Sequence, residues 1–292
     1  MERVWRDKKA IAFFLFPSFA ILALIIIVPI VMSSYYSLLK WDGFGKGDFI
    51  GLKNYIKLFS DPAFLMSVRN SLIFAATSVF IQLPISLLLA LVISKGVKYE
   101  RFFVTVFFIP VIISTVVIGQ LWMKIYNPEY GLLNMFLRAV GLSNLTREWL
   151  GSTDTALMAS VVPVLWQYIG YHMLLMYAGI KSIPGDVFEA AKIDGASWFK
   201  TSAFITIPML KPILKVSLTF AVVGALKVFD LVFVLTRGGP ARASEVTSTL
   251  MVETIFKSNS YGYGSAMAVF VIVECFVLYL LIGKLFKTDE VA

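Results

Sequence analysis

The stretch Ser182–Pro212 reads SIPGDVFEAAKIDGASWFKTSAFITIPMLKP and is a long polar interruption in a strongly apolar chain. Pro184 fixes the backbone for a first helical position, and Asp186 places a negative charge in the first turn, where the helix dipole favours it. Gly195 can end that helix about three turns later, because glycine adopts the left-handed conformation of a helix C-terminus at little cost. We therefore predict one short helix in the first half of this stretch.

A second short helix is predicted from the residues that follow. Ser197 is a suitable N-cap, and Pro208 and Pro212 are expected to stop this helix and restart the chain. The two predicted helices meet at Asp194-Gly195-Ala196 and together form a loop over residues 182–210.

The first predicted helix has one apolar and one polar face. Val187 and Phe188 share a face with Ala191, whereas Glu189 stays outside. The small side chains of Ala190 and Ala191 would permit close approach by a partner. The residues alone leave an alternative open, in which the loop is an amphipathic linker that rests on the membrane surface.

Three short motifs in this loop resemble the EAA signature of ABC importer permeases. They are Glu189-Ala190-Ala191, Asp194-Gly195-Ala196 and Ile205-Thr206-Ile207-Pro208. The resemblance implies that the loop is a cytoplasmic element that seats in a groove on an ATPase subunit and transmits its closure to the pore. By position, it assigns this coupling role to Glu189, Ala190, Ala191, Asp194 and Gly195.

Composition places the chain in a bilayer. Of its 292 residues, 59% are hydrophobic and 15% charged, and its mean hydropathy is +0.82, far above that of a soluble domain. The net charge of +8 could suggest nucleic acid, but the basic residues lie mainly between apolar runs rather than in one patch. We therefore expect contact with membrane lipid and no nucleic-acid partner.

Apolar runs predict an all-α membrane protein with six transmembrane helices in a single permease domain over residues 1–292. About 20 apolar residues span a bilayer, and each predicted run is at least that long. The predicted spans cover about 11–38, 70–94, 102–126, 155–180, 212–236 and 263–283. With the loop at 182–210, this is the arrangement that the resemblance to type I ABC importer permeases implies.

An even number of spans places both termini on one side, and basic flanking residues favour the cytoplasm. The bias is modest because the first external loop also carries Lys40, Lys46, Lys53 and Lys57. The coupling role of the loop requires the same orientation, in the plasma membrane of a prokaryote. The inside would hold Arg3, Arg6, Lys8, Lys9, Lys95, Lys98, Arg101, Lys181, Lys192, Lys200, Lys211, Lys284 and Lys287.

Motifs outside the loop extend the resemblance to nearly the whole chain. They are WDGF at 41–44, GLKNY at 51–55, FSDPAF at 59–64, NPEYGLLN at 127–134 and LTRGGP at 235–240. Together they resemble the first of the two permeases in carbohydrate importers of the maltose and glycerol-phosphate type. The glycine and aromatic content between the first and second spans also predicts a folded external loop.

This resemblance implies a set of partners. They are a second, related permease, two ABC ATPase subunits, an extracytoplasmic sugar-binding protein and a carbohydrate substrate. The chain has no GxxxxGK[ST] phosphate loop, so it cannot bind ATP as the ATPase subunit does. We expect no cofactor in this chain, and ATP and Mg in the partner ATPase.

Charged and aromatic residues within the spans are the candidates for a solute pathway. Charge in a span is costly, so Lys227 and Asp230 should face a water-filled cavity or pair with each other, and both alternatives stay open. Sugar recognition needs aromatic faces and hydrogen-bonding groups, which favours a cluster in the fourth and fifth spans. Its further members are Trp166, Gln167, Tyr168, Tyr171 and Phe229, although helix packing or anchoring at the membrane interface explains each single aromatic better than sugar contact does.

The sequence predicts no metal site. His172 is the one histidine, and a packed or hydrogen-bonded role fits it best, while Cys275 stands alone in an apolar run. Gln82, Gln120 and Glu274 could line the pathway or bridge helices.

Two other functions are compatible with the sequence. An intramembrane enzyme would need a clustered acid, base or nucleophile set on adjacent spans, and the scattered acids argue against one. An ABC permease for a non-sugar solute is the second alternative. An anion permease should carry more cations in its spans than Lys227.

Overall fold

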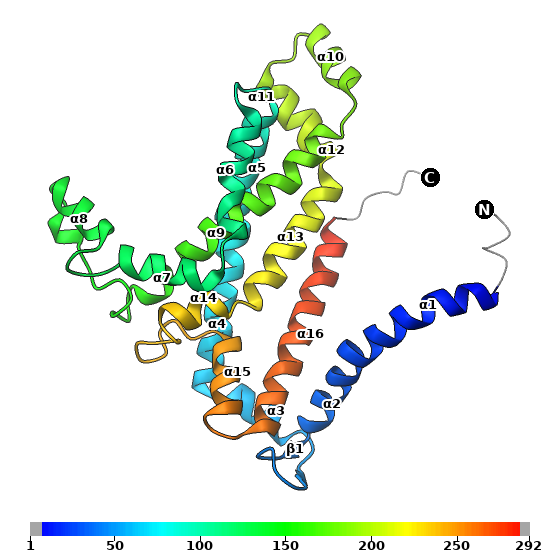
Figure 1. Cartoon of the computed structure of the whole chain (residues 1–292), viewed down its shortest axis with the longest axis vertical. Coiled ribbons are helices and arrows are strands. Elements are labelled where there is room, and N and C mark those ends of the chain that lie inside the picture. Colours follow the sequence, from blue (N-terminus) through cyan, green and yellow to red (C-terminus); the bar gives the residue numbers. More distant parts are fainter. Residues whose placement is uncertain (1–7, 287–292) are drawn as a thin grey trace. The chain divides into compact units, whose positions relative to one another are not determined.

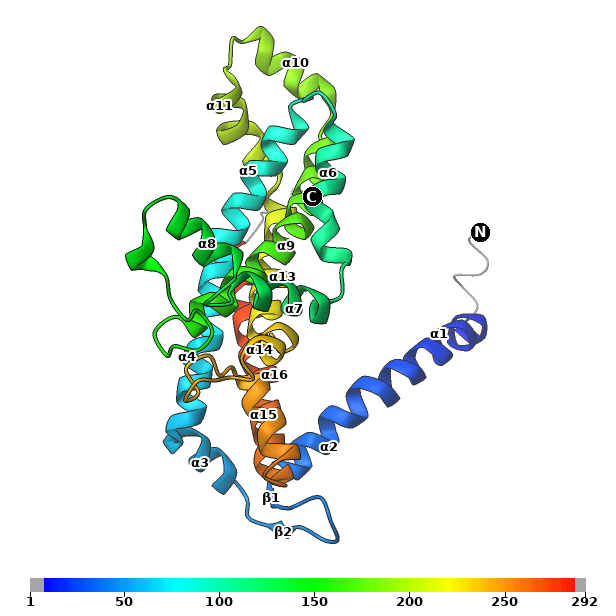
Figure 2. The same ribbon diagram turned by 60° about the vertical axis from the view of Figure 1, so that its left-hand side comes forward.

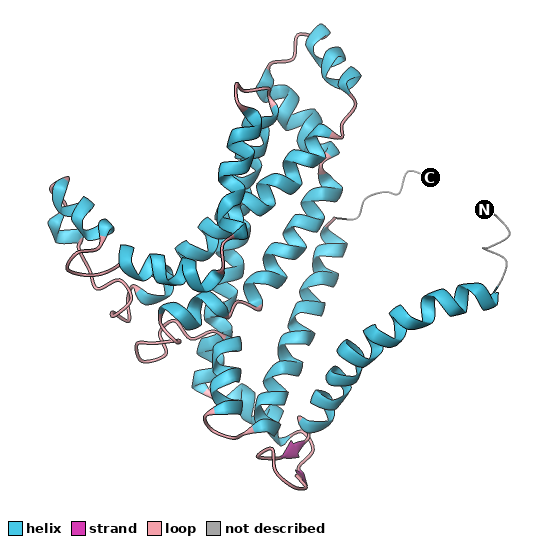
Figure 3. Cartoon of the chain, viewed as in Figure 1, coloured by secondary structure: helices cyan, strands magenta, loops and turns pink. Residues whose placement is uncertain are grey.

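The computed structural model describes residues 8–286, with side chains from Phe13 onward, and this part of the chain is mostly helix (Figures 1 and 3). The predicted basic residues Arg3, Arg6 and Lys287 lie outside it. The described residues divide into two compact units, one over residues up to 61 with 251–272 and one over 62–250 with 273–286.

The first unit contains the N-terminal helix and a small folded loop. β1 pairs antiparallel with β2, with Leu39 opposite Phe49, and the buried Asn54 amide donates hydrogen bonds to the carbonyls of Ser37 (2.8 Å) and Leu39 (2.9 Å). The expected folded loop is therefore present. The unit comprises α1 (Lys8–Leu22), η2 (Ala23–Ile27), α2 (Val28–Tyr36), β1 (Leu39–Lys40), β2 (Asp48–Phe49), α3 (Lys53–Ser60) and parts of α15 (Thr247–Phe256) and α16 (Tyr261–Leu285).

The second unit is a helical bundle in which α9 packs along α5 and α6 (Figures 1 and 2). Gly170 permits this approach, because a Cβ there would collide with the Phe107 carbonyl oxygen. The unit holds α4 (Pro62–Thr77), η3 (Ser78–Gln82), α5 (Leu83–Ser94), α6 (Glu100–Ile112), α7 (Thr115–Ile125), α8 (Leu132–Ala139), η4 (Ser143–Leu145), α9 (Ala156–Lys181), α10 (Gly185–Ile193), α11 (Trp198–Thr201), η5 (Ser202–Thr206), α12 (Ile207–Met209), α13 (Lys211–Leu226) and α14 (Asp230–Leu235).

Within residues 8–286, four helical runs are long and apolar enough to cross a membrane: Phe13–Tyr36, Pro62–Ser94, Lys211–Leu235 and Tyr261–Leu285. Each overlaps a predicted span. The fourth predicted span is the 26-residue helix α9, which is long enough but carries a polar middle around Gln167. The count of six spans thus stays a prediction.

The third predicted span, residues 102–126, is not one straight helix. It consists of α6 and α7, which meet at an angle of 96° across Ile113 and Ser114. Ile113 caps α6 in an extended conformation, with a ψ of 139°. If both pieces lie in the membrane, this pair forms a broken span or a re-entrant loop, whose exposed backbone is tolerated next to protein or a water-filled cavity.

Three prolines within helical runs are accommodated by π-helical turns. The turns η2, η3 and η5 each end two residues before a proline, at Pro29, Pro84 and Pro208 respectively. A wider turn relieves the clash between a proline ring and the preceding carbonyls. The helix that begins at Trp198 ends at Met209, one residue beyond Pro208, and α13 begins at Lys211 with Pro212 in its first turn. The predicted stop and restart at these two prolines is therefore confirmed.

Candidate functional site

The loop over residues 182–210 begins with a short, well-capped helix. Pro184 directly precedes α10, and Gly195 lies just beyond its end with a φ of +71°. The amide of Ala196 donates to the Ala191 carbonyl (2.9 Å) and that of Gly195 to the Lys192 carbonyl (3.1 Å). These two bonds are the Schellman arrangement that favours glycine at this position.

The faces of α10 follow the predicted pattern. Ala191 is buried and Phe188 packs against an apolar cluster formed by α5, α9 and Leu210. Glu189 and Ala190 are exposed. The outer face of α10 therefore offers a carboxylate and a small side chain to a partner.

The second helix of the loop starts at the predicted N-cap. The Ser197 hydroxyl accepts a long hydrogen bond from the Lys200 amide (3.4 Å), and Trp198 is half-buried. Phe199 and Phe204 are 76% and 78% exposed, which is high for large aromatic side chains. Ile193 at the end of α10 is 86% exposed as well, so three large apolar side chains of the loop lie uncovered by the rest of the chain.

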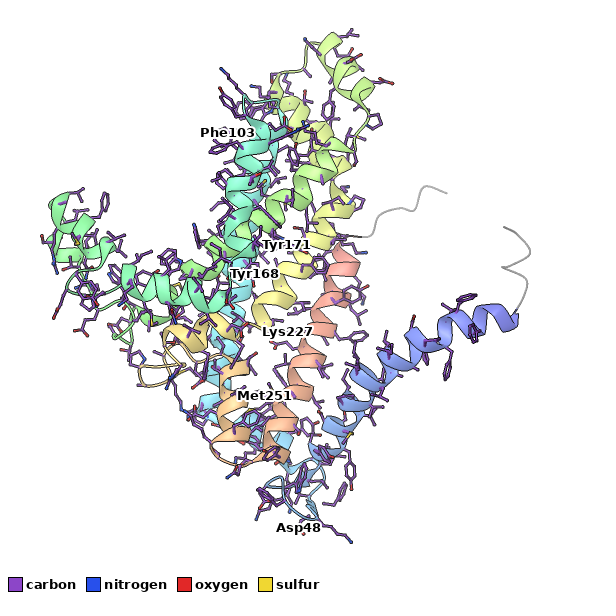
Figure 4. All side chains as sticks on the ribbon, viewed as in Figure 1. Asp48, Phe103, Tyr168, Tyr171, Lys227 and Met251 are labelled. Carbon is purple, nitrogen blue, oxygen red and sulfur yellow. The ribbon has the colours of Figure 1, made fainter. Side chains whose placement is uncertain are left out.

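A second candidate site is a cavity of about 260 Å³ in the interior of the second unit. Its walls come from five parts of the chain: η3, the start of α7, the middle of α9, the end of α13 and the start of α14. Figure 4 shows Tyr168 and Tyr171 on α9 and Lys227 at the end of α13. The polar and aromatic residues that line it are Ser78, Gln82, Thr115, Gln167, Tyr168, Tyr171, His172, Phe220, Lys227, Phe229 and Asp230.

Most of the predicted pathway residues meet at this cavity. Six of the seven line it, namely Gln167, Tyr168, Tyr171, Lys227, Phe229 and Asp230. Trp166 does not, and its ring instead meets that of Trp122 edge to face, with centroids 5.9 Å apart. This contact is of the helix-packing kind considered for each aromatic, although Trp166 is still 38% exposed, so its place in the pathway stays a prediction.

Gln167 occupies the most constrained polar position of the wall. Its side chain is 1% exposed, and its Nε2 donates a long hydrogen bond to the Ile113 carbonyl at the α6–α7 break (3.5 Å). Its buried Oε1 has no hydrogen-bond partner among the described residues. A buried acceptor without a partner costs free energy unless water or a ligand donates to it.

The charged residues of the wall do not neutralise each other. Lys227 and Asp230 are both exposed and form no ion pair within the described part of the chain. They lie where the helix breaks, since α13 ends at Leu226 and α14 begins at Asp230. The sequence left open whether Lys227 and Asp230 face a cavity or pair with each other, and in the structure both line the cavity.

His172 has the hydrogen-bonded role expected from the sequence. It is 3% exposed, and its Nδ1 lies 2.8 Å from the Ser217 hydroxyl oxygen, which joins α9 to α13. Among residues 8–286, no group of three His, Cys, Asp or Glu side chains could hold a metal ion.

Among the polar and aromatic wall residues, Ser78, Thr115 and Phe220 were not singled out from the sequence, and His172 was predicted only in a packed or hydrogen-bonded role. Ser78, Thr115 and Phe220 come from three different helices. Serine and threonine are common in membrane helices as caps and bridges, so neither identity nor spacing distinguishes these two. A signal for Thr115 would have been the helix break directly before it, which the apolar run around Ile113 conceals.

Comparison with known proteins gives a family match. Residues 82–287 match the model of the family described as "Binding-protein-dependent transport system inner membrane component". The matched region contains both the loop and most of the cavity wall.

Two relatives align over almost their full length. The chain is 41% identical over 280 residues to a probable ABC transporter permease protein, YurN, of Bacillus subtilis, covering 95% of this chain and 96% of the relative. It is 34% identical over 289 residues to the trehalose/maltose transport system permease protein MalF of Thermococcus litoralis, covering 98% and 97%.

A solved structure shares the fold. It is the crystal structure of a bacterial alginate ABC transporter in complex with an alginate pentasaccharide-bound periplasmic protein. One of its chains superimposes with a TM-score of 0.84 and 22% identity, covering 98% of each chain.

Proposed function

Because this chain belongs to the family of binding-protein-dependent transport system inner membrane components, we propose that it forms one half of the translocation pathway of an ATP-driven sugar importer. It is a multi-pass membrane subunit and not an enzyme, since ATP hydrolysis in such transporters belongs to a separate subunit. The observation that carries the proposal is the cavity in which Gln167, Tyr168, Tyr171, Lys227, Phe229 and Asp230 come together.

The chemistry of the cavity supports a sugar as the solute. Tyr168, Tyr171 and Phe229 supply aromatic faces for pyranose rings, and Gln167 and Asp230 supply acceptors for hydroxyl groups. The Thermococcus litoralis relative is named for trehalose and maltose. A carbohydrate therefore fits both the wall of the cavity and the relatives better than another solute does.

The loop over 182–210 is proposed to bind the ATPase. Glu189, Ala190, Ala191, Asp194 and Gly195 would form the contact, and the exposed Ile193, Phe199 and Phe204 would add apolar area to it. ATP and Mg would be bound by the two ATPase subunits. This arrangement requires the loop and both termini to lie in the cytoplasm.

A second permease subunit is proposed to complete the pathway. No residue of the apolar run Phe13–Tyr36 is buried in this chain, so this helix is available to lipid and to another membrane subunit. Six membrane crossings follow if α6 with α7, and α9, both cross. A sugar-binding protein would then deliver solute from the opposite, extracytoplasmic side.

The test is reconstitution of the complex, purified by a tag on this chain, into proteoliposomes. We expect an ATPase and a second permease to co-purify, and uptake of a radiolabelled sugar from a screened panel to require MgATP and a binding protein. Gln167→Leu should reduce uptake by about tenfold, the loss of one buried hydrogen bond to solute. Recovery of this chain alone, or sugar uptake that Gln167→Leu leaves unchanged, would contradict the proposal.

A further inference from the structure

The loop over 182–210 is attached to the bundle at its root by a charged network. Lys181, the last residue of α9, pairs with Glu100, the first residue of α6, with 2.7 Å between Nζ and Oε1. The Tyr177 hydroxyl donates to the same Glu100 oxygen. Lys181 Nζ also donates a long hydrogen bond to the Ser94 carbonyl at the end of α5 (3.5 Å). Three helices therefore meet in one network directly before the loop begins.

The second helix of the loop also contacts the turn between α5 and α6. Lys95, the C-cap of α5, places its Nζ 5.5 Å from the centre of the Trp198 ring, in the second helix of the loop. Trp198 and Phe188 both pack on the apolar cluster that includes Ile93. The α5–α6 turn, residues 95–99, thus contacts both helices of the loop directly or through this cluster.

The network is more than a surface ion pair. The side chains of Lys181 and Glu100 are 44% and 21% exposed, so solvent screens the charge pair and the pair by itself would contribute little. The Tyr177 hydrogen bond to the same carboxylate fixes its position, and shared charge-assisted bonds are stronger than isolated ones. Lys181 also lies over the Tyr177 ring, 5.5 Å from its centre.

The helix α6, which the Glu100 network joins to the root of the loop, extends to the cavity. α6 runs from Glu100 to Ile112, a length of about 20 Å at the usual rise per residue. The residue after this helix is Ile113, whose carbonyl accepts a hydrogen bond from the Gln167 amide. Thr115, beyond the break, lines the cavity. A single helix, which contains Pro110 in its last turn, therefore connects the root of the loop to the cavity wall.

We propose that Glu100, Tyr177 and Lys181 are positioning residues that clamp the loop to α6, so that a displacement of the loop moves α6 and the α6–α7 break at the cavity. The clamp rests on the proposed role of the loop in ATPase binding. It makes the α5–α6 turn, which lies outside the loop motifs, a second part of the coupling apparatus.

The first experiment measures amide hydrogen exchange in the permease pair, embedded in lipid nanodiscs without ATPase. Glu100→Gln and Lys181→Gln should each accelerate exchange in residues 182–200 by roughly three- to tenfold, the range for a partly exposed charged network. Salt at about 1 M should accelerate the wild-type loop and leave Glu100→Gln unaffected. Lys192→Gln, which removes an exposed charge within the loop, is the matched control and should exchange as wild type does.

Charge reversal separates a specific pair from general loosening. Glu100→Lys and Lys181→Glu should each accelerate exchange, and the double variant should exchange more slowly than either single variant. Restoration will be partial, because the swapped charges oppose the helix dipoles at these termini. Additive effects in the double variant, or wild-type exchange in both single glutamine variants, would overturn the clamp.

The second experiment tests transmission. With the ATPase bound, addition of Mg and a non-hydrolysable ATP analogue should change exchange across residues 109–115 in the wild type and not in Glu100→Gln. The amount of ATPase retained should stay within a few-fold of wild type. No change in wild-type α6 would refute transmission, whereas wild-type sugar uptake by Glu189→Ala would refute the proposed role of the loop and leave the exchange results on the clamp standing.

Discussion

The loop over 182–210 and the cavity around Gln167 differ in whether their polar groups have partners within the chain. In the loop, backbone groups at the helix ends are satisfied locally, by Ser197 and by the bonds around Gly195. In the cavity, Gln167 Oε1 has no partner within the described structure, and Lys227 and Asp230 face open space. The difference shows that the loop stabilises its two helices with its own groups, whereas the cavity wall keeps hydrogen-bonding and charged groups without partners in the described residues.

The largest effect should come from adding one methyl group to α9, the helix that carries Gln167, and the same addition in the loop is the comparison. Gly170→Ala places a Cβ against the Phe107 carbonyl, so we expect a loss of about 2–3 kcal/mol in the free energy of unfolding. Gly185→Ala is the matched change in the loop, where a Cβ meets nothing within 4 Å, and it should change stability by less than about 0.5 kcal/mol. Thermal unfolding of the purified complexes measures both, and equal losses would show that the α6–α9 approach is not as tight as described.

Glu189→Ala should have the next largest effect, on function alone. Its exposed carboxylate makes no ion pair in the described structure, so the melting temperature should not change. Sugar uptake should fall by at least about tenfold, as expected when a charged contact at a partner surface is removed, while ATP hydrolysis becomes independent of transport. Glu148→Ala, at an exposed position far along the chain from the loop, is the control. Wild-type uptake in Glu189→Ala would rule out the coupling assignment.

Gln167→Leu should affect stability and uptake differently. The variant loses the long hydrogen bond from Nε2 to the Ile113 carbonyl, but it also removes a buried acceptor without a partner, so stability should stay within about 1 kcal/mol of wild type. Uptake should fall nevertheless, because the solute would lose a hydrogen-bonding group. A melting curve and an uptake assay on the same preparation decide the matter, and a variant that is both unstable and inactive would mean that Gln167 is a structural residue.

The smallest effect is expected at the cap of the second loop helix. Ser197→Ala removes a long hydrogen bond to the Lys200 amide, so local stability should fall by about 0.5 kcal/mol, the low end for an N-cap. Exchange of amides 198–201 should accelerate two- to threefold, about the factor that this energy gives, and the melting temperature of the complex should stay constant. Ser197→Asp should restore the cap, and failure of aspartate to do so would show that the hydroxyl does not act as one.

The same contrast explains what the sequence could and could not predict. The helices of the loop depend on neighbours in sequence, so Pro184, Gly195 and Ser197 were sufficient to place them. Pro208 and Pro212 likewise marked where the second helix ends and α13 begins, although the π-helical turn before Pro208 was not predicted. The α6–α7 bend was missed because the two residues at the bend are Ile113 and Ser114, and neither is a glycine or proline that would indicate a break.

For the cavity, sequence reasoning found the residues whose presence in a span is expensive. Lys227 and Asp230 were identified because burying them against lipid would cost too much, and Gln167 because its amide can form hydrogen bonds with sugar hydroxyls. Ser78 and Thr115 carry no such cost, and only the packing of their helices brings them to the wall. Trp166 was included because its aromatic face could stack on a sugar ring, but its ring packs on Trp122 instead of lining the cavity.

The N-terminal helix has a consequence for how this chain changes over evolutionary time. Since no residue of Phe13–Tyr36 is buried against its own chain, a substitution there meets no interior shape that it must fit. Selection on this segment then acts on the length and hydrophobicity of the helix, and on its packing against any neighbouring subunit. Sequence should therefore drift faster along this helix than along α9, where a single methyl group at Gly170 already meets another backbone.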